Sequence, residues 1–390
     1  MKYEWQECTI GDLGQIVTGK TPPTKNNEYW GGKVMFITPK DIQATKHIFK
    51  TERYVTGEGK VAVRGAILPK GSICVSCIGN IGYLGITTEE CISNQQINSI
   101  IVNENNDIDF VYYLLKSLWA YFKNYEGQST ALSILNKTQF SKIKVQIPNI
   151  EVQKKIAGVL KMLDEKIELN TAINNNLEQQ AQAIFSNEFL TLETLPEGWK
   201  QASLIDIADY LNGLAMQKYR PTADETGIPV LKIKELRQGC CDDNSELCSP
   251  SIKSEYIIHD GDVIFSWSGS LLVDFWCGGI CGLNQHLFKV TSNKYNKWFY
   301  YAWTKHHLDR FIAVAADKAT TMGHIKRDEL SKAEVLIPNE ADYKRIETLL
   351  QPIYDLIIAN RIENKKLAET RDTLLPKLMS GELDVSDIDL

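Results

Sequence analysis

Two stretches of the chain carry apolar residues in alternating steps of four and three. The first seam runs through Ile156, Leu160, Leu163, Ile167, Asn170, Asn174 and Leu177. The second lies 190 residues further on, at Ile346, Leu350, Ile353, Ile357, Asn360, Asn364 and Leu367. A sustained seven-residue repeat is typical of a coiled coil. Because both seams change from aliphatic residues to asparagine at the same place, we expect two long helices that pair with each other. The alternative is that each helix packs, as an amphipathic helix, on its own globule.

The remainder of the chain is duplicated too. SKIKVQIPN at 141–149 returns as SKAEVLIPN at 331–339, and the pair Asn94-Gln95 returns as Asn284-Gln285. Each copy opens with short apolar runs that are broken by Gly, Pro and Asn, which predicts a mixed α/β globule. The expected order is therefore globule, helix, globule, helix. The predicted boundaries are 1–150, 151–190, 191–340 and 341–390.

Pairing of the two helices would give a pseudo-twofold molecule. If they run antiparallel, each helix carries its globule to an opposite end of a rod. A helix over residues 153–186 is about 50 Å long at 1.5 Å per residue, the length of about 15 base pairs of DNA. Two globules on such a rod could read two short half-sites that are separated by a fixed gap.

The amino-acid composition argues against a membrane protein, a secreted protein and a metal-binding protein. The 390 residues are 43% hydrophobic and 24% charged, which is typical of a soluble globular protein. No apolar run is long enough to span a membrane, and the opening MKYEWQECTI lacks the apolar segment of a signal peptide, so we expect a cytoplasmic protein without a membrane partner. The nine cysteines lack paired zinc-finger spacing, and buried reduced thiols are expected rather than a metal site.

Positive charge is concentrated in two regions, although the net charge is −6. Residues 20–70 hold 10 Lys and Arg against 4 Asp and Glu, and residues 289–327 hold 8 against 2. Two separate basic regions in an acidic chain suit two nucleic-acid contact surfaces. Charge alone fits an ordinary solvated surface equally well.

The segment GQIVTGKT at 14–21 matches the phosphate-loop pattern of nucleotide-binding proteins. A working phosphate loop needs a helix that opens at Gly-Lys-Thr, whose backbone N–H groups hold the phosphates. Here Pro22 and Pro23 follow directly and lack those donors. The second copy, DYLNGLAMQ at 209–217, keeps only one glycine of the pattern. Nucleotide binding therefore stays an alternative function, as does a coiled-coil scaffold without a DNA role, and no cofactor is expected.

The chain resembles the specificity (S) subunits of type I restriction-modification systems. The resemblance covers nearly all of the chain and is carried by GKTPPTKNNEYWGG with FITPKDI (19–42), SNQQINSII (93–101), IPNIEVQKKIAGVLKMLDEKIELN (147–170), LPEGWK (195–200) and LLPKLMSGEL (374–383). It implies two target recognition domains, each reading half of a bipartite double-stranded DNA sequence. It also implies that an antiparallel coiled coil separates these domains and docks two methyltransferase subunits, with restriction subunits in the full complex.

The resemblance implies a subunit without catalysis, and we expect no catalytic residue. The chain lacks the Asn/Asp-Pro-Pro-Tyr/Phe motif of an adenine methyltransferase. Asp164-Glu165-Lys166 has the composition of a nuclease triad, but we expect it on the solvent face of the first long helix, where charges aid solubility. SCIGNIGYLG at 76–85 predicts a turn-rich hairpin that places Ser76 and Asn80 near DNA.

Sequence readout needs exposed side chains with paired donors and acceptors, chiefly Arg, Lys, Asn and Gln. In the first domain the predicted DNA contacts are Lys20, Thr21, Thr24, Lys25, Asn26, Lys40, Gln128, Ser129 and Thr130. In the second domain they are Gln217, Lys218, Tyr219, Arg220, Lys232, Lys234, Lys318, Thr320 and Thr321. Solvated loop residues with no contact to DNA are the alternative at each position.

Overall fold

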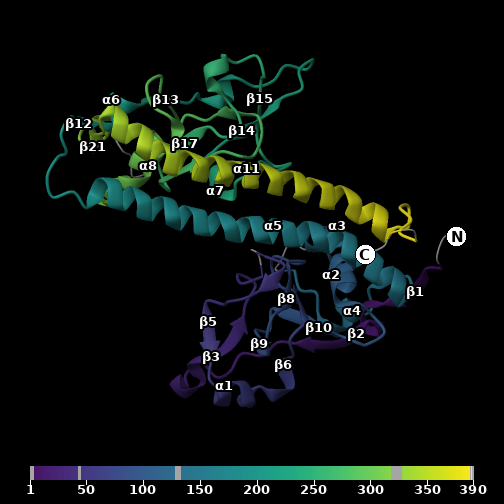
Figure 1. The fold of residues 1–390 in the computed structure, drawn as a ribbon. Helices are drawn as coiled ribbons and strands as arrows, with labels where there is room; N and C mark the ends of the chain where they lie inside the picture. The colour runs from purple at the N-terminus through teal and green to yellow at the C-terminus, as the bar shows by residue number, and fades with distance from the viewer. Residues whose placement is uncertain (1–3, 43–44, 128–132, 318–326, 387, 389–390) are drawn as a thin grey trace. The chain divides into compact units, whose positions relative to one another are not determined.

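The computed structural model describes residues 4–42, 45–127, 133–317, 327–386 and 388. The chain folds as two compact units. Unit 1 comprises residues 1–168 and 367–390, and unit 2 comprises residues 169–366. Two long helices, α5 (Ile150–Phe185) and α11 (Glu340–Met379), each contribute to both units (Figure 1).

Unit 1 contains three sheets, with the strand orders β2-β10-β7-β8-β4, β5-β3-β9-β6 and β1-β11. The strands are β1 (Gln6–Thr9), β2 (Gly14–Thr18), β3 (Trp30–Ile37), β4 (His47–Ile48), β5 (Arg53–Val55), β6 (Ile67–Leu68), β7 (Ile73–Ser76), β8 (Leu84–Thr87), β9 (Cys91–Ser93), β10 (Ile97–Val102) and β11 (Lys144–Ile147). The shorter helices are α1 (Gly57–Ala62), α2 (Ile108–Ser117), α3 (Trp119–Gly127) and α4 (Lys137–Ser141).

Unit 2 repeats this topology. Its sheets have the orders β13-β20-β17-β18, β15-β14-β19-β16 and β12-β21. The strands are β12 (Lys200–Ser203), β13 (Asp209–Asn212), β14 (Ile228–Leu231), β15 (Leu247–Cys248), β16 (Ile257–Ile258), β17 (Val263–Ser266), β18 (Leu272–Phe275), β19 (Cys281–Leu283), β20 (Leu287–Thr291) and β21 (Glu334–Ile337). The shorter helices are α6 (Leu204–Ile207), α7 (Ile233–Gln238), α8 (Lys297–His306), α9 (Leu308–Asp317) and α10 (Arg327–Ser331). The central parallel pair β3·β9 of unit 1 has its counterpart in β14·β19.

The repeated Ile-Pro-Asn motif marks the same local structure in both units. Each copy ends a strand, β11 or β21, and begins a long helix. The side-chain oxygen of Asn149 accepts from the backbone N–H of Val152, and that of Asn339 accepts from the backbone N–H of Asp342. Asparagine suits this role because its side chain satisfies a donor that the helix leaves unpaired. The motif is therefore a helix start, which explains its place ahead of both seams.

The two long helices run antiparallel where they pair. In unit 2, Asn170 donates to Asn364 at 2.9 Å, and Asn174 accepts from Asn360 at 2.9 Å, so the partner number falls as the helix number rises. The mixed α/β fold with paired long helices and an internal repeat is confirmed. In unit 1, the seam residues Ile156 and Leu160 are fully buried in the core.

Further seam positions are buried or pack against the core. In unit 2, Ile346, Leu350 and Ile357 are buried, and Leu177 and Ile353 pack against the same core. The side chains of Leu163, Ile167, Asn364 and Leu367 are partly exposed.

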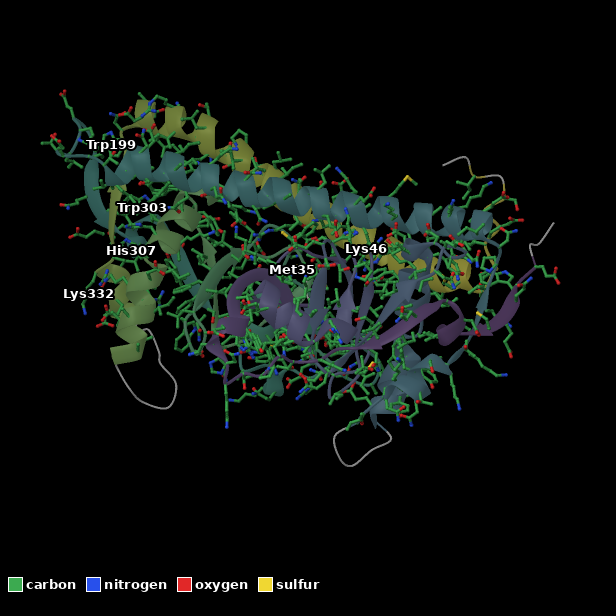
Figure 2. The ribbon with its side chains drawn as sticks, turned by 90° about the horizontal axis from the view of Figure 1, so that it is seen from below. Met35, Lys46, Trp199, Trp303, His307 and Lys332 are labelled. Atoms are coloured by element: carbon green, nitrogen blue, oxygen red, sulfur yellow. The ribbon has the colours of Figure 1, made fainter. Side chains whose placement is uncertain are left out.

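Aromatic side chains fill much of the core of unit 2. Trp303 lies edge-on to Phe185, the last residue of α5, with ring centroids 5.0 Å apart. Beside it, the ring of His307 stacks on Trp303, and its Nε2 lies 2.8 Å from the carbonyl oxygen of Glu334 (Figure 2). Through these contacts the end of α8, the end of α5 and strand β21 share one core.

Candidate nucleic-acid interface

In unit 1, several polar loops meet beyond the ends of the parallel strands β3 and β9. They surround an open cleft of about 510 Å³. The cleft is lined by Thr38, Pro39, Lys40, Glu52, Arg53, Ile78, Gly79, Asn80, Asn94 and Gln96. Asn94 donates to Gln96 at 2.9 Å, which orients two amide side chains at the cleft. Amides and a guanidinium at a cleft wall supply the paired donors and acceptors that base edges require.

The loop that follows β2 is held against this region by a close backbone approach. A Cβ atom at Gly19 would lie 2.1 Å from the carbonyl oxygen of Asn94, so only glycine fits there. Gly213 occupies the same position in unit 2, where a Cβ would lie 2.2 Å from the carbonyl oxygen of Asn284. The side chain of Thr21 donates to Gln95 at 2.6 Å.

This geometry explains the segment GQIVTGKT without nucleotide binding. Strand β2 ends at Thr18, and the next helical turn begins only at Asn27, so no helix opens at Lys20. The backbone N–H groups that would cradle a phosphate are therefore not arranged at a helix N-terminus. The glycine that unit 2 keeps is the one that the loop packing requires.

The predicted DNA contacts of unit 1 lie on these loops. Lys20, Thr24, Lys25 and Lys40 are exposed. Thr21 and Asn26 are partly exposed, and the Asn26 side chain caps the short turn at Glu28. Gln128, Ser129 and Thr130 lie outside the described residues.

Three polar residues that line this cleft were missed by the sequence reasoning: Arg53, Asn94 and Gln96. The guanidinium carbon of Arg53 lies 3.8 Å from the ring centre of Trp30, so the aromatic ring positions it. The repeated pair Asn94-Gln95 could have pointed to this loop, since a polar pair that follows a buried strand in both copies marks a shared loop.

Ser76 was wrongly expected near DNA: it is fully buried, donates to the carbonyl oxygen of Asn80 and accepts from the N–H of Tyr83. Asn80 itself is exposed and lines the cleft.

Unit 2 presents the corresponding loops. The N–H of Leu214 donates to the carbonyl oxygen of Leu283, and the N–H of Gln285 donates to that of Leu214, which ties the loop at 213–220 to the loop at 284–286. The predicted contacts Gln217, Lys218, Tyr219 and Arg220 are all exposed on the first of these loops. Lys318, Thr320 and Thr321 lie outside the described residues.

Carboxylates accompany the basic residues of unit 2. Glu246 lies 2.8 Å from Lys232 and 3.6 Å from Arg220, while Asp242 lies 3.0 Å from Lys234. The hydrogen bond from Lys232 and its positive charge lower the pKa of Glu246 below its usual range. The loops of unit 2 are thus more nearly neutralised than those of unit 1.

The charge cluster Asp164-Glu165-Lys166 does not lie wholly on the solvent face, contrary to expectation. Asp164 is buried and accepts from the hydroxyl of Tyr113 on α2 and from Arg371 on α11, both at 2.6 Å. The seam pattern of α5 could not predict the burial of Asp164, because the helix that covers this residue, α2, lies in a distant part of the sequence. Asp164 thus connects α2 with both long helices, while Glu165 and Lys166 are exposed.

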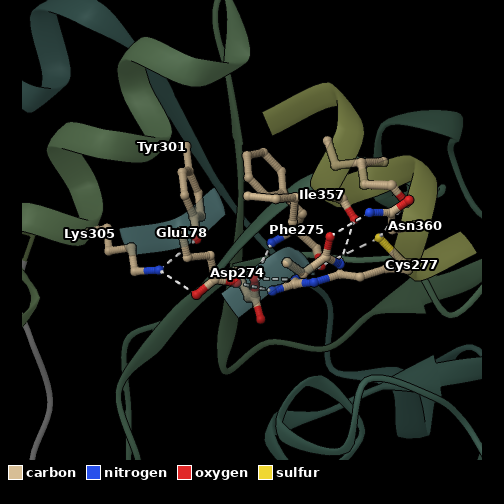
Figure 3. A network of polar contacts seen from close by, with 11 residues as sticks. Glu178, Asp274, Phe275, Cys277, Tyr301, Lys305, Ile357 and Asn360 are labelled. Carbon is tan, nitrogen blue, oxygen red and sulfur yellow. Dashed lines mark hydrogen bonds and ion pairs between the residues drawn. The ribbon is translucent and has the colours of Figure 1, made fainter. Parts of the chain in front are cut away.

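Unit 2 has a similar polar junction (Figure 3). Arg361 on α11 donates to Asp274 on β18 at 2.6 Å and to Glu178 on α5 at 2.8 Å. Glu178 in turn lies 3.7 Å from Lys305 on α8. Burial alone would lower the pKa of Arg361, but the neighbouring Asp274 raises it on balance, so the guanidinium stays charged. Each unit therefore attaches its α/β part to both long helices through ion pairs, buried at Asp164 in unit 1 and partly buried around Arg361 in unit 2.

The described residues show neither a cluster of three potential metal ligands nor a helix that is long and apolar enough to cross a membrane. Among the cysteines, the Cys77 thiol is buried, and burial raises its pKa to about 11. Such a thiol is inert packing material at neutral pH.

Two units of the same topology, each with basic and amide-bearing loops gathered at one sheet edge, define a duplicated recognition protein for a polyanion. The family model for the type I restriction modification DNA specificity domain matches the chain twice, over residues 2–179 and 196–369. The chain belongs to this family, which gives it the role of a DNA-recognition subunit.

Known relatives agree with this assignment. The type I restriction enzyme MjaIX specificity subunit of Methanocaldococcus jannaschii is 29% identical over 414 residues, spanning 99% of this chain and 95% of the relative. The HindI specificity subunit of Haemophilus influenzae is 36% identical over 171 residues, which are 42% of this chain and 37% of that protein. The crystal structure of a type I restriction-modification S subunit from M. genitalium has the same fold, with a TM-score of 0.60 at 15% identity over 97% of this chain and 96% of that one.

Proposed function

We propose that the chain is the non-catalytic DNA-recognition subunit of a type I restriction-modification complex. Each α/β domain reads one half of a bipartite double-stranded site, while the long helices set the gap and dock two methyltransferase subunits. Restriction subunits join the full complex. The observation that carries this proposal is the duplicated edge of exposed Lys, Arg, Asn and Gln residues at matching loops of the two units.

The chemistry of these loops suits readout of a duplex. Exposed lysines such as Lys20 and Lys25 supply sequence-independent attraction to phosphates. The amides of Asn94 and Gln96 and the guanidinium of Arg53 supply the directional hydrogen bonds that distinguish base pairs. Both kinds of contact at one edge favour sequence recognition over a scaffold role.

The outward face of α11 supports partner docking. Leu349 and Leu356 are 43% and 45% exposed, and Pro352 and Ala359 are exposed between and after them at helical spacing. The residues that lie 190 positions before Pro352 and Ala359 are Met162 and Leu169 on α5, which are 53% and 55% exposed. An exposed apolar stripe marks an interaction surface. Because α5 and α11 both carry such a stripe, we propose that each helix docks one methyltransferase subunit.

The test combines Lys25→Ala with Arg220→Ala, one change in each recognition domain. In complex with its methyltransferase subunits, the double variant should bind its site at least about tenfold more weakly at 0.1 M salt, with methylation reduced in parallel. The matched control is Lys144→Ala with Lys344→Ala, which removes one exposed cation from β11 and one from α11. Unchanged site-specific binding of the double variant would contradict the loop assignment.

The same preparation separates the alternative functions. A nucleotide-binding protein would bind ATP as an isolated chain, and Lys20→Ala would abolish that binding. A scaffold would assemble with the methyltransferase but show no preference among duplexes. We expect no ATP binding and a clear preference for one DNA sequence.

A further inference from the structure

Glu246 lies between two of the loops that are proposed to contact DNA in unit 2. Its Oε1 atom is 2.8 Å from Nζ of Lys232, and its Oε2 atom is 3.6 Å from Nη2 of Arg220. All three side chains keep access to solvent, with exposed fractions of 38% for Glu246, 39% for Lys232 and 55% for Arg220. One carboxylate therefore neutralises a cation from each loop at the surface.

A simpler ion pair occurs at the matching place in unit 1. Glu52 immediately precedes β5, as Glu246 immediately precedes β15, and 194 residues separate the two glutamates. Glu52 lies 3.9 Å from Lys40, and both residues line the cleft. The duplication thus keeps a glutamate beside a basic loop in both recognition domains, with the closer contact in unit 2.

Stability does not account for these glutamates. An exposed ion pair contributes little to stability, since water screens it and side-chain entropy opposes it. A negative charge on a DNA-contacting surface also repels the phosphates of the duplex. A carboxylate at this position therefore weakens sequence-independent binding of DNA. It does so where Lys232 and Arg220 would otherwise contact phosphates.

We propose that Glu246 is a specificity-determining residue of the second recognition domain. It holds Arg220 and Lys232 away from phosphates on arbitrary DNA, and it releases them only on a half-site whose base contacts compensate for the broken ion pairs. Selectivity is a difference between two affinities, and a residue that penalises the wrong duplex increases that difference. This inference rests on the proposed DNA-recognition function.

The direct test is Glu246→Gln in the chain assembled with its methyltransferase subunits. Binding is measured on a duplex that contains the selected site and on an arbitrary duplex, over a series of salt concentrations. The variant should bind the arbitrary duplex about five- to tenfold more tightly at 0.1 M salt, with a log–log salt slope that is steeper by between about 1 and 2, because up to two cations become free to contact phosphates. Affinity for the selected site should change less, so the ratio of the two affinities falls.

Two further variants make the result specific. Glu7→Gln is the matched control, because it removes the same charge from an exposed ion pair with Lys144 at 2.8 Å on the β1·β11 sheet. It should leave the affinity ratio unchanged. Adding Lys232→Gln to Glu246→Gln should remove part of the gain on arbitrary DNA, since it deletes one of the freed cations.

Other outcomes would overturn the inference. Unchanged affinity for arbitrary DNA in Glu246→Gln would show that Glu246 does not restrain the two cations. Loss of affinity for the selected site alone would show that Glu246 accepts a hydrogen bond directly from a base. A wild-type complex with no preference among duplexes would instead contradict the proposed function itself.

Discussion

At the scale of single residues, ion pairs connect the α/β part of each unit to its long helices. In unit 1 the hydroxyl of Tyr113 and the guanidinium of Arg371 both donate to Asp164, so three helices meet at one carboxylate. In unit 2, Arg361 joins Asp274 to Glu178. The pair of Asp164 with Arg371 is buried, and removing one partner of such a pair leaves an uncompensated charge and commonly costs about 3–5 kcal/mol.

His307 should make unit 2 sensitive to acid. Burial lowers the pKa of His307 to about 4, while an unfolded histidine titrates near 6.5. Between these values the unfolded chain binds the proton that the folded one does not, so the free energy of unfolding should fall as the pH drops from about 6.5 through about 4.

His307→Gln should reduce this pH dependence. The measurement is urea unfolding at pH 7 and pH 5, followed by tryptophan fluorescence, and the loss of stability between the two should be smaller in the variant than in the wild type. His259→Gln, at an exposed position, is the control and should behave like the wild type. Equal losses in wild type and His307→Gln would contradict the assignment of His307 as a buried neutral histidine.

At the scale of secondary-structure elements, the sequence predicted the long helices because their pairing surface repeats every seven residues. The expected pairing of asparagines appears as contacts between Asn170 and Asn364 and between Asn174 and Asn360. The burial of Asp164 could not be read in the same way, because its cover, Tyr113, lies 51 residues away in α2. Local periodicity reports which residues share a helix face, and it does not report which distant element packs on that face.

The polar seam gives a prediction for helix pairing. Asn360 donates to the side-chain oxygen of Asn174, and the amide N–H of Asn174 donates to the carbonyl oxygen of Ile357 at 3.2 Å. Asn174→Leu leaves the buried amide of Asn360 without its acceptor, and unit 2 should lose about 1–3 kcal/mol of stability.

The double variant Asn174→Leu/Asn360→Leu should recover that loss, because an apolar pair suits a seam position and leaves neither amide unpaired. Denaturant unfolding of the four members of the cycle measures the coupling, and Asn175→Leu, at an exposed position on α5, is the control. Additive effects of the two substitutions would exclude the coupling between Asn174 and Asn360.

The recognition loops were only partly predictable at this scale. Exposed basic residues such as Lys25 and Arg220 can be picked from composition, because loops outside a core carry charge. The cleft residues Arg53 and Gln96 could not, since they become neighbours only when β3, β5 and β9 pair across long stretches of sequence. The expectation that Ser76 lies near DNA was wrong, because its hydroxyl makes two hydrogen bonds within the hairpin, to Asn80 and from Tyr83.

At the scale of the whole molecule, the duplication is the basis of the proposed function. The order β13-β20-β17-β18 in unit 2 reproduces β2-β10-β7-β8 in unit 1, and β15-β14-β19-β16 reproduces β5-β3-β9-β6. A protein that carries the same recognition edge twice is suited to a site with two parts. The loops differ in sequence and in charge pairing, so the two parts of the site should differ as well.

Selection of bound duplexes from a randomised pool tests this account most directly. It uses the chain assembled with its methyltransferase subunits, in its natural form and with one heptad inserted into each of α5 and α11. The natural chain should select two short, different sequences at a fixed gap, and the lengthened chain should select the same sequences with the gap increased by about 3 base pairs, since seven residues add about 10 Å of helix. Selection of one uninterrupted sequence, or a gap that the insertion leaves unchanged, would contradict the account.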